Sequence, residues 1–238
     1  MSLRYAVGSD VGSVRENNED HVRVVPERGL FVVADGMGGH VAGEVASRVA
    51  VESFIEAVAK QPRPRRIKDE IAILEAAVHA ANNAVMDTAQ ARGLIGMGTT
   101  LTAALIRGRT ATIAHIGDSR AYLANDKLWM VTQDHTMAAL MVQSGLLSEH
   151  DAAAHPERHV LTQAIGTGRT IEPDVFQTRL PRATRILLCS DGLYDVVPAI
   201  EILQLMQDPD LDATVPALIQ AAKAHGGPDN ITVVLIDP

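Results

Sequence analysis

Three aspartates stand beside apolar runs, and their positions constrain the fold more than any other feature of this sequence. They are Asp35 after the run 30–34, Asp191 after the run 185–190, and Asp229 just before the run 231–236. Apolar runs of this length predict buried β-strands. If the three carboxylates meet at one edge, the last strand must run antiparallel to the other two. That arrangement favours an antiparallel sheet and disfavours a doubly wound parallel fold.

The rest of the chain divides into two strand-rich regions, each followed by a pair of helices. Hydrophobic periodicity predicts further strands at 5–8 and 21–25, a meander of strands at 99–106, 110–116 and 121–124, a strand pair at 176–180 and 185–190, and helices at 41–58, 71–92, 136–147, 198–206 and 214–225. Two packed sheets with helices outside them are therefore expected. This is an α+β fold, a four-layer αββα sandwich in which two central antiparallel sheets are flanked by helices.

Length and composition favour one large domain. The chain has 238 residues, of which 47% are hydrophobic, enough to bury a sizeable core, and we expect a single domain over residues 1–238. The formal net charge of -8 argues against a nucleic-acid partner or an anionic membrane surface. The single cysteine, Cys189, excludes an internal disulfide, and no apolar stretch is long enough to cross a bilayer. Because residues 1–15 lack the pattern of a signal peptide, we expect a cytoplasmic protein.

Carboxylates gathered at one edge of a sheet repel each other, so they are either exposed or neutralised by a cation. A ligand set made of oxygens indicates a hard cation, Mn²⁺ or Mg²⁺, because zinc favours histidine or cysteine. Two such ions could activate a water for in-line attack on a phosphoryl group. The residues themselves therefore predict a hydrolase of phosphoesters.

The polar loop 15–20 precedes a predicted strand and carries further candidate ligand-binding side chains. Arg15 in this loop is a natural clamp for a substrate phosphate, because a guanidinium group binds two phosphate oxygens at once. The alternative is that Arg15 pairs with Glu16 or Glu19 on a solvated loop and contributes nothing to substrate binding.

Seven short motifs occur along the chain in the order seen in metal-dependent protein phosphatases. They are Arg15-x-x-Asn18-Glu19-Asp20, Asp35-Gly36-Met37-Gly38-Gly39-His40, Gly96-Met97-Gly98-Thr99-Thr100, Gly117-Asp118-Ser119-Arg120, Asp134-His135, Ser190-Asp191-Gly192-Leu193 and Gly227-Pro228-Asp229-Asn230. Each motif alone is weak evidence, but seven in register over residues 5–236 are highly specific. The chain resembles a bacterial member of the protein phosphatase 2C family. The fold implied by this resemblance agrees with the strand-direction argument.

The resemblance implies two metal sites that share one ligand. Asp35, Asp191 and Asp229 match the ligands of a first metal ion. Glu19, Asp35 and the backbone carbonyl of Gly36 match the ligands of a second ion. Asp35 would therefore bridge the two ions, which the family binds as Mn²⁺ or Mg²⁺.

Other positions of the motifs imply supporting roles. Asp20 matches an acid that holds metal-bound water, and Arg15 matches the phosphate-binding arginine. Asp118 with Asp191 matches a third, weaker metal site described for bacterial members. The segment of about 143–160 corresponds to the family's flap subdomain, which borders the substrate groove.

The general acid is left open by the resemblance. Met37 stands where animal members carry a histidine proposed to protonate the leaving oxygen, and His40 does not occupy the equivalent position. A water held by Asp20 is one candidate, because a general acid needs only reach and a suitable pKa. We expect His115 to be a structural histidine, and the flap histidines, including His159, to be mostly plain surface residues.

The resemblance implies a phosphatase for phosphoserine and phosphothreonine in proteins, without a covalent intermediate, opposing a bacterial serine/threonine kinase. A phosphatase for a small phosphoester or for phosphorylated anti-sigma-type regulators is the rival enzyme. A non-catalytic scaffold that has lost its metals is the alternative from another class, but every acid that the site needs is present. We expect phosphorylated proteins as partners, no nucleic acid, no membrane and a monomeric chain.

Overall fold

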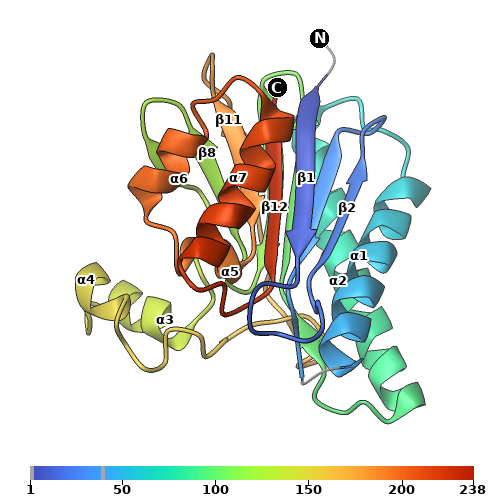
Figure 1. Cartoon of the computed structure of the whole chain (residues 1–238). Helices are drawn as coiled ribbons and strands as arrows, with labels where there is room; N and C mark the ends of the chain where they lie inside the picture. The colour runs from blue at the N-terminus through green and yellow to red at the C-terminus, as the bar shows by residue number, and fades with distance from the viewer. Residues whose placement is uncertain (1–2, 39–40) are drawn as a thin grey trace.

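Two antiparallel sheets pack face to face at the centre of the structure, a computed structural model that describes residues 3–38 and 41–238. One sheet has the strand order β1-β12-β11-β8-β9 and the other the order β10-β7-β6-β3-β2 (Figure 1). The strands are β1 (Arg4–Asp10), β2 (His21–Val25), β3 (Leu30–Ala34), β6 (Leu101–Arg107), β7 (Thr110–Ile116), β8 (Arg120–Ala124), β9 (Leu128–Met130), β10 (Asp174–Arg179), β11 (Arg185–Cys189) and β12 (Ile231–Asp237). A separate ladder joins the short strands β4 (Gly36–Met37) and β5 (Gly98–Thr99).

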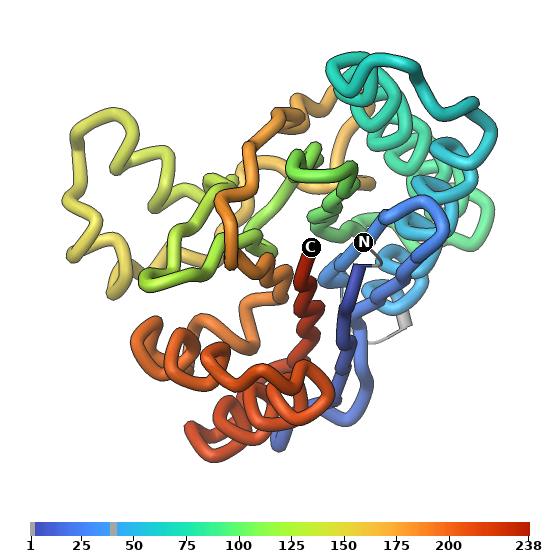
Figure 2. The backbone as a smooth tube through the Cα atoms, turned by 90° about the horizontal axis from the view of Figure 1, so that it is seen from above, coloured from blue at the N-terminus to red at the C-terminus, as the bar shows by residue number. Residues whose placement is uncertain are grey.

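Helices cover the outer faces of both sheets. The long helices α1 (Val41–Lys60) and α2 (Glu70–Arg92), with a 3-10 turn at Ile67–Asp69 between them, pack on the sheet that contains β3. The other sheet is covered by α5 (Asp191–Tyr194), α6 (Ala199–Leu205) and α7 (Leu211–Ala224). The short helices α3 (Met137–Gln143) and α4 (Glu149–Ala152) project from the sandwich as an arm (Figures 1 and 2).

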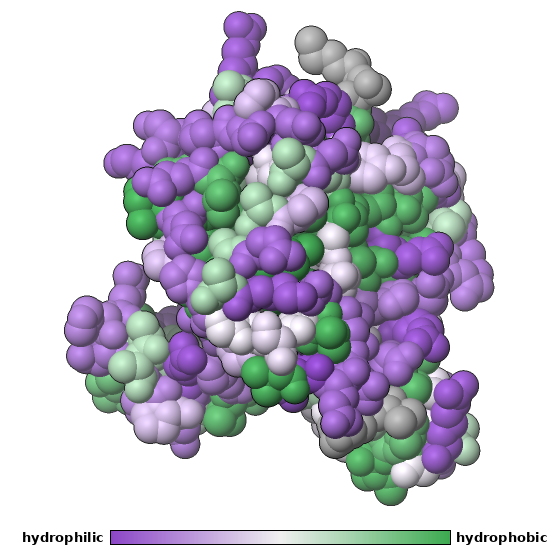
Figure 3. Space-filling view, viewed as in Figure 1, coloured by the Kyte–Doolittle hydropathy of each residue, from purple (hydrophilic) through white to green (hydrophobic). Residues whose placement is uncertain are grey.

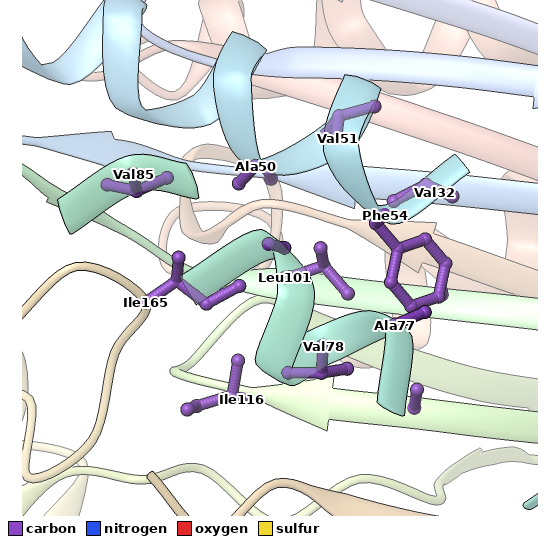
Figure 4. Packing of buried hydrophobic residues seen from close by; sticks show 14 of the residues in the cluster. Val32, Ala50, Val51, Phe54, Ala77, Val78, Val85, Leu101, Ile116 and Ile165 are labelled. Carbon is purple, nitrogen blue, oxygen red and sulfur yellow. The ribbon is translucent and has the colours of Figure 1, made fainter. Parts of the chain in front are cut away.

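Alternation of side chains along the central strands builds three cores from two sheets. In β3, Leu30, Val32 and Ala34 face α1 and α2, whereas Phe31 and Val33 face the opposite sheet. The same alternation in β11 divides its buried residues between the helices and the space between the sheets. Figure 4 shows the outer core, where Phe54 and Val78 pack close to Val32. The expected αββα layering is thus observed.

Two predicted strand pairings were wrong. The strand β8 does not continue a meander with β6 and β7, because the chain crosses at Gly117, with φ of 104°, into the other sheet, where β8 pairs with β11. The strands β10 and β11 also belong to different sheets, with β10 at an edge beside β7. Local periodicity identifies a strand but not its partner, and burial between sheets decides the pairing.

Smaller differences concern element ends. The predicted helix over 136–147 ends at Gln143, and Asp191 begins the short helix α5 rather than merely ending a strand. The short strand β9 was not predicted. Gly39 and His40 of the first glycine motif lie outside the described residues. Within the part of the chain that the structure describes, no helix combines the length and the apolar character needed to span a membrane.

Candidate metal centre

Acidic side chains from distant parts of the chain line one cleft, at the end of the sandwich where β3 and β11 finish and β12 begins. The cleft has a volume of about 540 Å³, and its acidic lining includes Glu19, Asp35, Asp118, Asp191 and Asp229. Arg15 and Gly36 line the same cleft, while Asp20 is buried, with 7% of its surface exposed. Since β12 runs antiparallel to β11, the carboxylates before one strand and after the other share an edge. Their roles as metal ligands stay a prediction.

The backbone of Asp35 is fixed by two threonines of the third motif. The amide of Thr100 donates to the Asp35 carbonyl at 2.9 Å, and the Thr99 hydroxyl donates to the same oxygen at 2.7 Å. The amide of Asp35 in turn donates to the Thr100 hydroxyl at 2.9 Å. These bonds hold the end of β3 against β5, so the Asp35 carboxylate emerges at a defined place.

The loop 15–20 is tied to the start of β12 by Asn230. The Asn230 side-chain amide donates to the carbonyls of Val11 and Asn17, each at 2.9 Å, and its side-chain oxygen accepts from the amide of Glu19 at 2.8 Å. Asn230 itself is buried, with 5% of its surface exposed. The Asn230 side chain therefore positions Glu19 relative to Asp229, the residue that precedes Asn230 in the sequence.

Glycine is required where the loop meets α1. A Cβ atom at Gly36 would collide with the backbone carbonyls of Gly43 and Glu19, and a Cβ atom at Gly43 would collide with the Glu19 carboxylate. The Glu19 carbonyl also accepts from the amide of Gly36 at 3.2 Å and from the Ser47 hydroxyl at 2.6 Å. The first turn of α1 thus approaches the acidic cluster closely because side chains are missing there.

Burial and electrostatic repulsion both disfavour negative charge on the carboxylates of the cluster. Burial raises the pKa of Asp35 well above its usual value, and the negative charges of Asp20, Asp191, Asp118 and Asp229 raise it further. Burial, followed by the charges of Asp118 and Asp229, likewise raises the pKa of Asp191 well above its usual value. The protein alone therefore provides too little positive charge for these carboxylates to ionise together at neutral pH.

Two buried carboxylates at the cluster also have unsatisfied oxygens. The Oδ1 atoms of Asp20 and Asp191 have no hydrogen-bond partner among the described residues, although Asp20 Oδ2 accepts from the Ser190 hydroxyl at 2.7 Å. A buried polar atom without a partner is costly, and here the missing partner must be positive or a donor. An oxygen donor set with unsatisfied carboxylates fits a hard divalent cation.

Arg15 pairs with a residue that the sequence did not suggest. Its guanidinium lies 2.7 Å from Asp229 Oδ2, an acid that was not among the expected partners, and 54% of its side chain is exposed. Burial lowers the pKa of Arg15, but the charges of Asp229, Glu19 and Asp191 outweigh this and raise it. The arginine thus stands at the rim of the cleft, held by an acid at its edge.

The predicted flap segment, about 143–160, brings a histidine to the cleft, although its histidines were expected to be mostly plain surface. His159 Nδ1 lies 3.9 Å from Asp191 Oδ2, and His159 Nε2 lies 3.2 Å from Asp195 Oδ2. Ligand atoms of Asp118, His159 and Asp191 lie within 4.8 Å of one another. No local sequence pattern predicts that His159 lies at the cleft. The position of Asp195 near the cleft could have been predicted, because it follows Asp191 by four residues and so lies on the same side of α5.

The second histidine prediction, that His115 is structural, agrees with its contacts. His115 is fully buried in β7, its Nδ1 contacts the Thr102 hydroxyl at 2.9 Å, and its Nε2 contacts the Gln133 carbonyl at 2.9 Å. Burial, together with the charge of His135, lowers the pKa of His115 to about 3, so the ring stays neutral.

The electrostatics predict how a cation changes stability with pH. Burial raises the pKa of Asp20 to about 6 and that of Asp118 to about 7. The folded chain without metal therefore keeps protons that the unfolded chain releases near pH 4, so the contribution of these groups to the free energy of unfolding falls as pH rises through about 4 to 7. Mg²⁺ or Mn²⁺ should offset this loss. We expect the rise in melting temperature on adding metal to be larger at a pH of about 7.5 than at about 5.

The measurement is thermal unfolding with metal and with chelator, and its control is a matched pair of variants. Asp191→Asn should shrink the metal-induced rise, while Asp126→Asn, at an exposed turn outside the cleft, should leave it unchanged. Equal melting temperatures with metal and with chelator at both pH values would contradict the prediction.

Comparisons with known proteins agree with the fold and the motifs. The model of the family "Protein phosphatase 2C" matches residues 8–233. The serine/threonine protein phosphatase PstP of Mycobacterium tuberculosis is 42% identical over 239 residues, covering 100% of this chain and 45% of PstP, so the chain spans less than half the length of that relative. The serine/threonine phosphatase stp of Listeria innocua is 36% identical over 236 residues, covering 96% of this chain and 93% of stp.

A solved structure extends the likeness to three dimensions. It is the catalytic domain of the serine/threonine protein phosphatase PstP in complex with two manganese ions, which is 40% identical and superposes with a TM-score of 0.86 over 99% of this chain and 97% of the other. The expected family and the expected α+β sandwich are both confirmed. The family model, the relatives and the fold together show that this chain belongs to the protein phosphatase 2C family.

Proposed function

We propose that this chain is a metal-dependent serine/threonine protein phosphatase that hydrolyses phosphoserine and phosphothreonine without a covalent intermediate. The observation that carries the proposal is the convergence of Asp35, Asp191 and Asp229 on one cleft, with Arg15 at its rim. Relatives named serine/threonine phosphatases and a relative's manganese complex support it. Its substrates would then be phosphorylated proteins, and the enzyme that it opposes would be a serine/threonine kinase.

We assign the ligands as the sequence motifs suggest. Asp35, Asp191 and Asp229 would hold one Mn²⁺ or Mg²⁺ ion, and Glu19, Asp35 and the Gly36 carbonyl a second. Asp118 with Asp191 would hold a third, weaker ion. When bound, the ions would supply positive charge for the phosphate and lower the pKa of the attacking water.

Side chains of the protein would bind the phosphate, orient the attacking water and supply a proton to the leaving oxygen. Arg15 would bind two phosphate oxygens, and Asp20 Oδ1, which has no hydrogen-bond donor among the described residues, would accept a hydrogen bond from the attacking water. His159 Nδ1, the ring nitrogen nearest Asp191, would donate a proton to the leaving oxygen on the flap side of the cleft, while Nε2 is held by Asp195.

We further propose that residues 1–238 form one catalytic domain with a flap at about 143–160, acting as a monomer in the cytoplasm. The support for one domain is that both sheets contribute to a shared core, through Phe31 of β3 and Ile186 of β11. The support for a flap is the arm of α3 and α4, closed at its base by a bridge between Thr136 and Leu161. A phosphatase for small phosphoesters remains the second candidate, because the cleft lining alone does not select a protein.

Metal dependence and the bridging role of Asp35 give the first kinetic test. Activity on p-nitrophenyl phosphate and on a phosphothreonine peptide should require Mn²⁺ or Mg²⁺ and vanish with chelator. Asp35→Asn should lower kcat/KM by at least about 100-fold and more than Asp118→Asn, because Asp35 would contact two ions and Asp118 one weak ion. Unchanged metal affinity of Asp35→Asn by calorimetry would refute the bridging role. A high ratio of small-ester to peptide activity would favour the second candidate.

Arg15 gives the second test. Its bond to Asp229 holds the guanidinium beside the cleft, and neutralising Asp229 would free it for phosphate. Arg15→Ala should raise KM for a phosphopeptide and lower kcat/KM roughly ten- to a hundredfold, about 1.5–3 kcal/mol, the cost of one charge-assisted contact.

The control is Arg15→Lys, which keeps the charge but loses the two-pronged geometry and should restore only part of kcat/KM. Metal content, measured in parallel, should stay normal in both variants. Normal kcat/KM in Arg15→Ala with normal metal content would show that Arg15 only screens Asp229.

His159 gives the third test, in which leaving groups are compared. A serine alkoxide needs a proton as it leaves, whereas p-nitrophenolate does not, so His159→Gln should lower kcat for a phosphoserine peptide by about tenfold or more and barely change kcat for p-nitrophenyl phosphate. His150→Gln is the matched control, since His150 lies on the same flap with 97% of its side chain exposed. An equal loss on both substrates would assign His159 to positioning the flap instead.

A further inference from the structure

Three successive backbone carbonyls hold the chain around Asp118, and each of them binds a different part of the molecule. The Gly117 carbonyl accepts from the amide of His135 at 2.8 Å, in the segment that leads into α3. The Ser119 carbonyl accepts from a threonine hydroxyl of β6 at 2.7 Å. The carbonyl of Asp118 itself accepts from the Tyr194 hydroxyl at 2.9 Å. Contacts from three separate elements therefore decide where Asp118 lies.

The bond from Tyr194 differs from the other two, because it comes from the helix that carries Asp191. Both residues lie on α5, three positions apart, so they are neighbours on one side of that helix. The Tyr194 backbone thus belongs to the helix of Asp191, while its hydroxyl holds the backbone of Asp118. Ligand atoms of Asp118 and Asp191 lie within 4.8 Å of each other. Tyr194 is therefore a direct tie between these two acids.

Asp191 also has anchors that do not involve Tyr194. The amide of Ser190, the residue before Asp191, donates to a carbonyl of β12 at 3.1 Å. A Cβ atom at Gly192, the residue after it, would collide with a backbone carbonyl that lies just before β12, so α5 begins in close contact with that strand. Loss of the Tyr194 hydroxyl should therefore release Asp118 without displacing Asp191.

Arg120 fixes the ring of Tyr194. Its Cζ atom lies 3.5 Å from the centroid of that ring, a cation–π contact. The same guanidinium donates to both carboxylate oxygens of Asp134, most closely from Nη2 to Oδ2 at 2.6 Å, and to the Tyr122 hydroxyl at 3.1 Å. Only 24% of the Arg120 side chain and 13% of the Asp134 side chain are exposed. A two-pronged pair this well shielded from water gives Tyr194 a fixed surface on which to stack.

Asp134 connects this cluster to the base of the arm formed by α3 and α4. In the space-filling view of Figure 3 the arm is a separate lobe at the lower left, with a hollow between it and the sandwich above. Its base is held through His135, the residue after Asp134. The His135 amide donates to the Gly117 carbonyl, and the His135 carbonyl accepts from the amide of Thr162 at 2.8 Å. The cluster therefore holds the base of the arm and the backbone of Asp118 relative to each other.

Arg120 and Asp134 belong to two of the seven sequence motifs, yet neither is a proposed ligand. We propose that Tyr194 is a positioning residue whose hydroxyl sets the separation of Asp118 from Asp191, and that Arg120 with Asp134 keeps its ring in place. This inference rests on the proposed function, in which Asp118 and Asp191 hold the weakest of three ions. Tyr194 is not among the residues that line the acidic cleft, so it acts through Asp118 and not on a ligand.

The test compares two variants that each lose one tyrosine hydroxyl. Tyr194→Phe keeps the ring that stacks on Arg120 but removes the bond to Asp118. Tyr122→Phe is the matched control, because that hydroxyl contacts the same guanidinium instead of Asp118. In calorimetric titrations of the metal-free full chain with Mn²⁺, Tyr194→Phe should raise the dissociation constant of the weakest ion by about fivefold or more. The control should bind all ions as the wild type does.

A double-variant cycle tests the part played by Arg120. Arg120→Lys keeps the charge but loses the fork that binds Asp134, so it should raise the same dissociation constant. Adding Tyr194→Phe to it should change the constant little further, because both substitutions act through one hydroxyl. Fully additive losses would refute the role of Arg120 in holding Tyr194.

Three results would overturn the proposal. They are an unchanged dissociation constant of the weakest ion in Tyr194→Phe, an equal increase in Tyr122→Phe, and a wild-type chain that binds only two ions. A lower melting temperature of Tyr194→Phe in chelator, with unchanged Mn²⁺ affinity, would show that Tyr194 only stabilises the fold. A wild-type chain that binds three ions but has no phosphatase activity would refute the proposed function alone, because Mn²⁺ affinity is measured without substrate.

Discussion

Repulsion among buried carboxylates is the constraint on which the rest of this structure depends. Burial raises the pKa values of Asp35, Asp118 and Asp191, and the negative charges of neighbouring carboxylates raise them further. Folding must hold them together in spite of this, and it does so by fixing the backbone: Thr100 holds Asp35, and Asn230 holds Glu19. The sandwich therefore stores an unfavourable interaction that a bound cation would relieve. This links the metal requirement of the site to the stability of the fold.

The antiparallel sandwich separates two kinds of charge along the same strands. Strands such as β3 and β11 begin at an end of the sandwich that Arg28, Arg107 and Arg109 line, and they end at the acidic cluster, while β12 runs the other way. Between the two ends lies a core of alternating apolar residues, so neither charged end is neutralised by the other. The acidic end is therefore suited to bind cations.

The acidic cleft has a buried floor and a half-exposed rim, and different interactions hold the side chains of these two parts. On the floor, Asp20 and Asp118 are 7% and 6% exposed; the Ser190 hydroxyl donates to the Asp20 carboxylate, and the Tyr194 hydroxyl donates to the Asp118 backbone carbonyl. The rim, with Arg15 and His159, is held by ion pairs to Asp229 and Asp195. Exposed ion pairs are weak, so these two side chains can move to a substrate more easily than the floor can. In such a site, the side chains that contact the substrate can adjust their positions, whereas the acids of the floor stay fixed.

The sequence by itself determined the strands of the sandwich, because alternation and apolar runs are local, and it determined the family, because seven short motifs keep their order. From the assumption that Asp35, Asp191 and Asp229 share one edge, the sequence also predicted that the last strand runs antiparallel to the other two. Only the tertiary structure decided that β8 and β11 share a sheet, that Arg15 pairs with Asp229, that Asn230 ties the first loop to the last strand, and that His159 reaches the cleft. These contacts join residues far apart in the chain, and their partners are chosen by packing and by charge in the folded molecule, which no local pattern records.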